Sequence, residues 1–282
     1  MNIAILSGKG GTGKTFVSCN LAKTINKCNY LDCDIEEPNA HLFFKDAKVI
    51  YTEDVNIKIP KVNKDICISC RNCANFCKFN AIAMIKDKPM FFDKVCHSCG
   101  GCKIVCPVDA IYEEPKKIGE IIYRKHNDID LYSGLLNEGE VSGIPVIENL
   151  LEKIDDNKIN IIDCPPGSAC SVRESISKAD FCILVCELTS FGKTNLDMVI
   201  ELVKLLNKPY AIVINKYEEI SKELLDKMGL EKHGVLSKIP FKKEIANKVS
   251  LGNFAVDFDE DINNIFKEML DKIITSVKGG KN

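Results

Sequence analysis

Short apolar runs alternate with amphipathic stretches along most of this 282-residue chain. Runs of about five apolar residues between polar or glycine positions predict buried strands, and they lie at Asn2–Leu6, Tyr30–Asp34, Ile159–Asp163, Phe181–Cys186 and Ala211–Lys216. Apolar residues at helical spacing predict helices over Lys14–Asn26, Ser142–Ile154, Asn195–Leu206, Ser221–Met228 and Asp259–Val277. Residues Ile118–Lys125 and Asp128–Tyr132 predict a pair of neighbouring strands. Strands that alternate with helices predict an α/β fold, with a mostly parallel, doubly wound sheet and helices on both faces.

Between residues 59 and 115 this alternation stops and cysteines dominate. The runs Cys67-x-x-Cys70-x-x-Cys73-x-x-x-Cys77 and Cys96-x-x-Cys99-x-x-Cys102-x-x-x-Cys106 are one pattern written twice, 29 residues apart. Thiolates at this spacing bind iron–sulfur clusters, and the pattern is that of the bacterial two-cluster ferredoxins. One difference is that Pro107 follows the second run, whereas Lys78 follows the first.

In such ferredoxins the first three cysteines of a run bind one cluster and the fourth binds the other. We therefore expect two 4Fe–4S clusters, one held by Cys67, Cys70, Cys73 and Cys106 and the other by Cys96, Cys99, Cys102 and Cys77. Zinc and disulfides are the alternatives. Zinc sites use two CxxC pairs per ion and give no reason for a third cysteine. Disulfides need an oxidising compartment, for which the sequence carries no signal.

A second motif lies at the start of the chain. Residues 8–15 read Gly-Lys-Gly-Gly-Thr-Gly-Lys-Thr and stand between a predicted strand and a predicted helix. This is the sequence and the context of a P-loop, whose backbone N–H groups surround a polyphosphate. Lys14 is expected at the β- and γ-phosphates and Thr15 at Mg²⁺. The expected phosphate contacts are Gly8, Gly10, Gly11, Thr12 and Gly13.

Composition narrows the function only slightly. The formal net charge of −2 gives no electrostatic footprint for nucleic acid. Met1 is followed directly by a buried strand, without the features of a signal peptide, and no apolar stretch reaches the roughly 18 to 20 residues of a membrane span. We therefore expect a cytoplasmic protein. In that compartment the seven of its 15 cysteines outside the two runs stay thiols.

Because it has Lys9 early in the loop, the sequence resembles the deviant Walker family of P-loop ATPases. That family includes MinD, ParA and the nitrogenase iron protein and is related to Mrp-like ATPases. In that family a lysine at this position reaches the nucleotide of a facing subunit. The resemblance implies a homodimer that holds two ATP molecules between its subunits. A second cation at the γ-phosphate would stabilise the transition state as an arginine finger does. The alternative is that Lys9 binds phosphate in its own subunit or is solvated.

Three further segments match this family in the right order. Asp34, in Asp32-Cys33-Asp34, resembles the switch I residue that orients the attacking water. Asp163, before Cys164-Pro165-Pro166-Gly167, resembles the Walker B residue that holds Mg²⁺ through water, with the Gly167 N–H toward the γ-phosphate. Asn215 ends a later strand and in relatives contacts the purine. Because Glu218 replaces the aspartate of the GTPase motif, ATP is favoured over GTP.

Nearly the whole chain resembles a subgroup of MinD-like ATPases that carry an inserted ferredoxin domain. This implies a discontinuous P-loop ATPase domain, residues 1–58 and 116–282, and a small α+β ferredoxin domain, residues 59–115. Cys170 lies seven residues after Asp163. The iron protein of nitrogenase has a ligand cysteine at a similar distance, so Cys170 could hold a shared metal or cluster between two subunits. The alternative for Cys170, as for Cys33 and Cys164, is a buried thiol.

In MinD itself a C-terminal amphipathic helix binds the membrane. The last predicted helix here has an apolar stripe, and its polar face starts with acidic residues at positions 257, 259, 260 and 261. Helices that lie on membranes are rich in Lys and Arg instead. We therefore expect this helix to pack on the sheet, and we expect no membrane partner and no nucleic acid.

Together these features predict an ATP-driven homodimer whose nucleotide state controls electron transfer to a partner metalloprotein or to a metallocofactor under assembly. An iron–sulfur carrier that donates a cluster is the first alternative. A positioning protein of the MinD/ParA type is the second.

Overall fold

A computed structural model gives the fold of the chain and describes residues 1–218, 225–226 and 228–279. Its main sheet has nine strands in the order β11-β10-β9-β1-β8-β2-β7-β6-β3. The seven from β11 to β7 run parallel to one another. They are β1 (Asn2–Leu6), β2 (Cys28–Asp32), β7 (Ile129–Leu136), β8 (Ile159–Asp163), β9 (Phe181–Cys186), β10 (Tyr210–Tyr217) and β11 (Val235–Pro240). The predicted α/β class with a mostly parallel sheet is confirmed.

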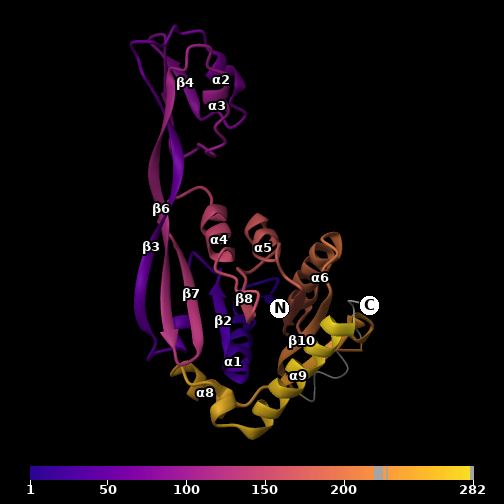
Figure 1. Ribbon diagram of the computed structural model, residues 1–282. Coiled ribbons are helices and arrows are strands. Elements are labelled where there is room, and N and C mark those ends of the chain that lie inside the picture. The colour runs from indigo at the N-terminus through magenta and orange to yellow at the C-terminus, as the bar shows by residue number, and fades with distance from the viewer. Residues whose placement is uncertain (219–224, 227, 280–282) are drawn as a thin grey trace.

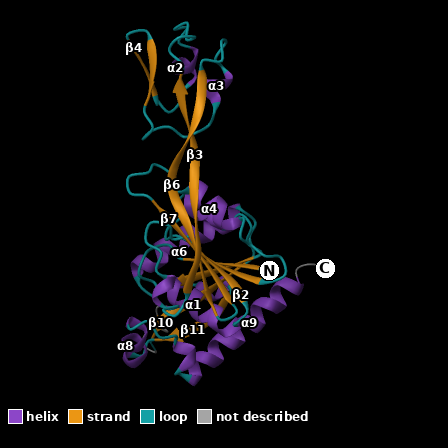
Figure 2. Ribbon diagram, turned by 60° about the vertical axis from the view of Figure 1, so that its left-hand side comes forward, coloured by secondary structure: helices purple, strands orange, loops and turns teal. Residues whose placement is uncertain are grey.

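Helices cover both faces of this sheet (Figures 1 and 2). One core includes apolar residues of α4 (Ile144–Leu151), α5 (Cys170–Ser175) and α6 (Ser190–Leu205). The other includes α1 (Lys14–Ile25), α8 (Lys243–Ser250) and α9 (Glu260–Gly279). The strands are buried on both sides because each face carries its own layer of helices, which explains their continuous apolar sequences.

The C-terminal helix packs on the sheet, as the sequence predicts. Its buried residues are Ile262, Phe266, Met269 and Ile273, which belong to the core beneath α1 and α9. Among the helices that the structure describes, none has the length and apolar character needed to cross a membrane. The predicted helix at Ser221–Met228 falls largely outside the described residues.

A long antiparallel ribbon extends from the edge of the sheet (Figures 1 and 2). It consists of β3 (Lys48–Val62) and β6 (Ile111–His126), which pair over almost their entire length. The predicted strand Ile118–Lys125 is the lower half of β6, and it pairs with β7 as expected. Residues 59 and 115 lie within the ribbon, where Ile59 pairs with Glu114. The ribbon carries the cysteine-rich segment away from the main sheet.

The segment at the end of the ribbon is small and repeats its own design. Each cysteine run has one short helix, α2 (Asn72–Phe76) or α3 (Gly101–Ile104), and a hairpin of β4 (Ile82–Ile85) and β5 (Lys88–Phe91) lies between them in sequence. Both helices begin after a residue with left-handed backbone, Arg71 or Gly100. The repeated sequence therefore folds into repeated local structure.

Candidate functional site

The glycine-rich loop joins β1 to α1 and leaves no space for side chains at two positions. Gly13 has a φ of +87°, and a Cβ atom there would lie 2.1 Å from Asn215 Nδ2. At Gly8 a Cβ atom would lie 2.2 Å from the Asn195 carbonyl oxygen. Glycine is therefore required for space at both positions and for the backbone conformation at Gly13, as in a loop that curls around phosphate groups.

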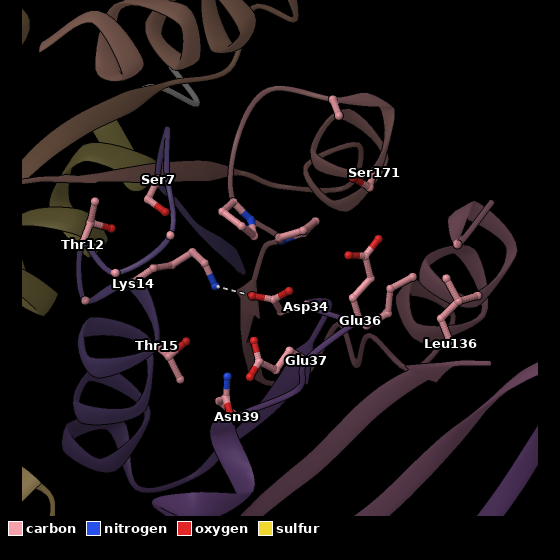
Figure 3. A pocket seen from close by; sticks show the side chains of 18 of the residues that line it. Ser7, Thr12, Lys14, Thr15, Asp34, Glu36, Glu37, Asn39, Leu136 and Ser171 are labelled. Atoms are coloured by element: carbon pink, nitrogen blue, oxygen red, sulfur yellow. Dashed lines mark ion pairs between the residues drawn. The ribbon is translucent and has the colours of Figure 1, made fainter. Parts of the chain in front are cut away.

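This loop forms one wall of a cleft of about 1260 Å³. The other walls come from the segments after β2 and β8 and from the turn before α4 (Figure 3). The predicted site residues that line it are Gly10, Gly11, Thr12, Gly13, Lys14, Thr15, Asp34 and Cys170. Ligands of open α/β sheets bind outside the carboxyl ends of the strands, which is where this cleft lies.

Lys14 is the buried cation of the cleft. Its Nζ lies 2.6 Å from Asp163 Oδ1 and 3.8 Å from Asp34 Oδ2, and the second pair is drawn in Figure 3. Burial alone lowers the pKa of Lys14, but the neighbouring carboxylates, Asp163 first, raise it above its usual range. Lys14 is therefore charged, and it is bound to the two acids predicted to act on metal and water. A polyphosphate in the cleft would compete with these acids for the ammonium group.

Asp163 has a second partner that the sequence analysis missed. The Tyr30 hydroxyl donates a hydrogen bond of 2.9 Å to Asp163 Oδ2, and Ser18 Oγ lies 2.7 Å from the same hydroxyl. Burial, and then the charge of Asp163, raises the pKa of Tyr30 well above its usual value, so the phenol keeps its proton. Nothing in the sequence separates Tyr30 from the apolar residues around it, because the contact depends on how β2 and β8 pair.

The segment after β2 is held by Asp32. The Asp32 carboxylate accepts the backbone N–H groups of Asp34, at 3.3 Å, and Ala40, at 3.1 Å. Burial raises the pKa of Asp32 to about 8. Burial also raises the pKa of Asp34, which lines the cleft beside two glutamates (Figure 3). Carboxylates crowded in this way are stabilised by cations, and oxygen ligands of this kind fit Mg²⁺.

Thr12 supplies an independent indication of a ligand. Its Oγ1 atom is buried and has no hydrogen-bond partner among the described residues, although the residue lines the cleft. A buried hydroxyl group without a partner costs free energy. A phosphate oxygen in the cleft would accept this hydrogen bond, so the residues present fit a magnesium-bound nucleotide.

Two residues predicted to contact the nucleotide make hydrogen bonds to the protein's own backbone in this structure. The Gly167 N–H, expected at the γ-phosphate, donates to the Ser7 carbonyl oxygen at 2.8 Å. Asn215, expected at the purine, donates through Nδ2 to the Thr12 carbonyl oxygen at 2.8 Å. Both residues contact the backbone at or beside the P-loop, and neither is among the described residues that line the cleft.

Lys9 contacts its own chain here. Its Nζ lies 3.8 Å from Glu187 Oε2, and Lys216 Nζ lies 2.5 Å from the other oxygen of this carboxylate. Lys216 also donates to the Gly11 carbonyl oxygen at 3.0 Å. The Lys9 side chain is still 36% exposed. Neither Glu187 nor Lys216 is predicted from the sequence, in which the only signal is that Lys216 follows Asn215.

The eight cysteines of the two runs line two separate cavities at the end of the ribbon. One, of about 20 Å³, is lined by Cys67, Cys70, Cys73 and Cys106. The other, of about 120 Å³, is lined by Cys77, Cys96, Cys99 and Cys102. Each set joins three cysteines of one run to the last cysteine of the other, which is the division that a pair of cubane clusters requires. The donor set and its division therefore fit two 4Fe–4S clusters.

A third cavity, of about 450 Å³, lies at the base of this segment. Cys96, His97 and Ser98 line it on one side and also line the larger cysteine cavity. Residues 141, 142 and 144 line it on the other side and also line the nucleotide cleft. The turn before α4 therefore lies between the cleft and one set of cysteines.

The remaining cysteines differ in exposure. Cys170 is exposed at the start of α5 and lines the cleft. Cys33 and Cys164 are fully buried, and burial raises the pKa of both thiols. Within the described residues, no three His, Cys, Asp or Glu side chains converge as ligands of a single metal ion would.

Comparison with known proteins agrees with the fold. An uncharacterised protein of Methanocaldococcus jannaschii is 30% identical over 281 residues, which cover 97% of this chain and 98% of the relative. The septum site-determining protein MinD of Pyrococcus horikoshii, solved as a complex with Mg-ADP, has a similar fold. Its TM-score is 0.58 at 18% identity, with 96% of this chain and 95% of that chain covered.

A shorter match concerns a different kind of protein. The pyruvate synthase subunit PorD of Methanothermobacter marburgensis is 41% identical over 58 residues, which are 21% of this chain and 68% of that subunit.

Residues 3–256 match the family described as the CobQ/CobB/MinD/ParA nucleotide binding domain. The chain thus belongs to the CobQ/CobB/MinD/ParA family of P-loop nucleotide-binding proteins.

Proposed function

We propose that the protein is an ATP-hydrolysing homodimeric switch whose nucleotide state controls electron transfer through two 4Fe–4S clusters. In this proposal residues 1–58 and 116–282 form the ATPase domain, and residues 59–115 form an inserted ferredoxin domain. The electrons pass to a partner metalloprotein or to a metallocofactor under assembly. The observation that carries the proposal is the division of eight cysteines between two cavities in a chain of a nucleotide-binding family.

Backbone contacts to sulfur support the clusters. The Ser98 N–H lies 3.4 Å from Cys96 Sγ, and the Ala110 N–H lies 3.2 Å from Cys106 Sγ. Such N–H groups stabilise the negative charge of thiolate ligands and tune the reduction potential of the cluster that the ligands bind. Bound clusters would supply one-electron chemistry at low potential. The 58-residue similarity to a subunit of pyruvate synthase also supports this part of the proposal.

In the ATPase domain the buried acids and cations take the roles expected of a P-loop site. Lys14 would leave Asp163 for the β- and γ-phosphates of ATP, and Asp163 and Thr15 would be the protein groups that hold Mg²⁺, Asp163 through water. Asp34 orients the attacking water. Lys14 is paired with Asp34 and Asp163 in this structure. Because phosphate would replace these carboxylates as its partner, nucleotide binding would release both acids.

The same site supports a dimer. Lys9 is held in its own chain by an ion pair of 3.8 Å at a partly exposed side chain, and pairs of this kind contribute little free energy. Lys9 can therefore leave Glu187 and reach the γ-phosphate of a facing subunit. Lys216 remains on Glu187, so the carboxylate keeps a partner after Lys9 has moved.

Packing between the segment that resembles switch I, residues 34–39, and the turn before α4, residues 137–143, supports the coupling of nucleotide state to the clusters. The Leu136 N–H donates to the Ile35 carbonyl oxygen at 2.9 Å. A Cβ atom at Gly143 would lie 2.0 Å from Ile35 Cδ1, so the two segments are in close contact. The same turn lines the third cavity opposite Cys96 and His97. A movement of switch I would therefore reach the environment of one cluster and not the other.

The test is an anaerobic preparation in which iron content and molar mass are measured on the same sample. We expect about eight iron atoms per chain, and a doubling of mass when a slowly hydrolysed ATP analogue replaces ADP. The variant Lys9→Ala should keep its iron and stay monomeric with the analogue. About two metal ions per chain, with zinc in place of iron, or a mass that ignores the nucleotide, would contradict the proposal.

An iron–sulfur carrier is the second candidate, because exposed Cys170 lines the nucleotide cleft. Facing Cys170 thiols of two subunits could hold a shared metal or cluster. This candidate predicts iron beyond that of two cubane clusters per chain, and loss of only the additional iron in Cys170→Ser. Iron that is the same in both proteins would count against it.

A further inference from the structure

Tyr30 lies in the middle of β2, on the face of the sheet that α1 covers. Its side chain is fully buried, and its ring packs edge-on against Phe44 with 5.7 Å between ring centroids. Its hydroxyl group contacts two elements that carry the predicted metal ligands. It reaches Asp163 on β8 at 2.9 Å, and Ser18 on α1 at 2.7 Å.

The direction of these hydrogen bonds follows from the number of protons. An ionised carboxylate only accepts hydrogen bonds, so the single phenolic proton of Tyr30 is donated to Asp163. The Ser18 hydroxyl has one proton and two acceptors within reach, the Tyr30 oxygen at 2.7 Å and the Thr15 carbonyl oxygen at 3.1 Å, and it donates to the closer one. The Cys19 thiol is a second, longer donor to the Tyr30 oxygen, at 3.5 Å. Ser18 lies one helical turn after Thr15, so the relay from Ser18 through Tyr30 to Asp163 ties α1 to β8.

We propose that Tyr30 is a positioning residue of the magnesium site: its hydroxyl group keeps the Asp163 carboxylate oriented, at a fixed distance from Thr15, when Lys14 moves to the phosphates. This inference rests on the proposed role of Asp163 and Thr15 at Mg²⁺, and it assigns a residue that the P-loop motif does not contain.

The need for such a residue follows from burial. Asp163 has no exposed surface, and in this structure Lys14 and Tyr30 each occupy one of its two oxygens. When phosphate takes Lys14 away, the Tyr30 hydroxyl is the remaining described side-chain donor to this carboxylate. A buried carboxylate without a donor is strongly disfavoured and would rotate toward another donor. Tyr30 holds Oδ2 in place and would leave Oδ1 for the water shell of the metal.

The experiment measures metal affinity instead of turnover. Mn²⁺ serves as the probe, and the EPR signal of free Mn²⁺ gives its affinity for the complex of the anaerobic, oxidised protein with ADP. The variant Tyr30→Phe keeps the ring and its contact with Phe44. We expect its Mn²⁺ affinity in this complex to fall about tenfold, since one hydrogen bond to a charged group is lost. ADP affinity measured in EDTA should stay within twofold.

Two further variants make the result specific. Tyr123→Phe removes another tyrosine hydroxyl, which donates to Asp130 at 2.6 Å far from the cleft, and should leave Mn²⁺ affinity unchanged. Ser18→Ala removes the closer donor to Tyr30 and leaves the Cys19 thiol at 3.5 Å, so it should weaken Mn²⁺ binding by a smaller factor. It also tests the relay if Tyr30→Phe does not fold.

The inference is overturned if Tyr30→Phe, or Ser18→Ala in its place, binds Mn²⁺ as the unmodified protein does. It is equally overturned if the variant loses ADP affinity by the same factor with and without metal, since Tyr30 would then act on the fold alone. A failure of the proposed function looks different: the unmodified protein would then bind ADP with no dependence on metal, and Tyr30 would have no metal site to position.

Discussion

The substitution Lys14→Met tests the central electrostatic feature of the cleft. Lys14 and Asp163 are 6% and 0% exposed, and their charged atoms are 2.6 Å apart. Removal of one member of such a buried pair leaves an uncompensated charge and costs about 3–5 kcal/mol. Tyr30 alone would then hold the Asp163 carboxylate. We therefore expect Lys14→Met to lower the free energy of unfolding by that amount, even though methionine keeps an unbranched stem as long as that of lysine without its ammonium group.

The double variant Lys14→Met/Asp163→Asn separates charge from packing. Replacement of a whole buried pair by neutral groups is often close to neutral in stability, so we expect it to recover at least about 2 kcal/mol of the loss. Lys23→Met is the matched control on the same helix. Its partner Asp257 lies 3.5 Å away, with side chains 25% and 51% exposed, and such a surface pair contributes less than about 1 kcal/mol.

The assay is urea unfolding under anaerobic, reducing conditions, followed by far-ultraviolet circular dichroism, since most of the helical residues belong to the ATPase part of the chain. The reasoning is refuted if Lys14→Met is as stable as Lys23→Met. It is also refuted if the double variant is no more stable than the single one.

Three further outcomes follow from other sites. Partners lower the pKa of buried Asp130 even though burial alone raises it; its stabilisation is therefore present above about pH 4 and fades as pH falls. Asp130→Asn should cost about 1–3 kcal/mol at pH 7 and less at pH 3, which urea unfolding at both values checks. Gly13→Ala should abolish ADP binding measured by calorimetry, since its Cβ atom would lie 2.1 Å from Asn215 and its φ is +87°. Cys102→Ala should lose about half of the iron, whereas Cys182→Ala, a change at a buried cysteine of β9, should keep all of it in a colorimetric assay.

The sequence predicted the parts whose chemistry is local. The P-loop lies between one strand and the next helix, so a run of eight residues identifies it. The repeat predicts that the fourth cysteine of each run joins the other set, and the two cavities divide the cysteines in the same way. The parallel sheet followed from strands that are apolar throughout their length, since they are buried on both faces.

The ribbon was only partly predicted, for a physical reason. The first half of β3 is exposed on both faces, including Val49, Ile50 and Tyr51, so burial leaves no alternating pattern there. This half is stabilised by its pairing with β6, about 70 residues later in the chain. Tyr30 and Glu187 were missed for a related reason. Their partners at the site come from distant segments, and only the pairing of β1, β2, β8 and β9 brings them together.

The measurement that tests the account most directly is an EPR redox titration of the two clusters, with ADP and with a slowly hydrolysed ATP analogue. The turn before α4 lies between the nucleotide cleft and the cavity lined by Cys77, Cys96, Cys99 and Cys102. The account predicts that the analogue shifts the potential or the line shape of that cluster, while the cluster of Cys67, Cys70, Cys73 and Cys106 stays unchanged. Two signals that are identical with both nucleotides would contradict the coupling of ATP to electron transfer.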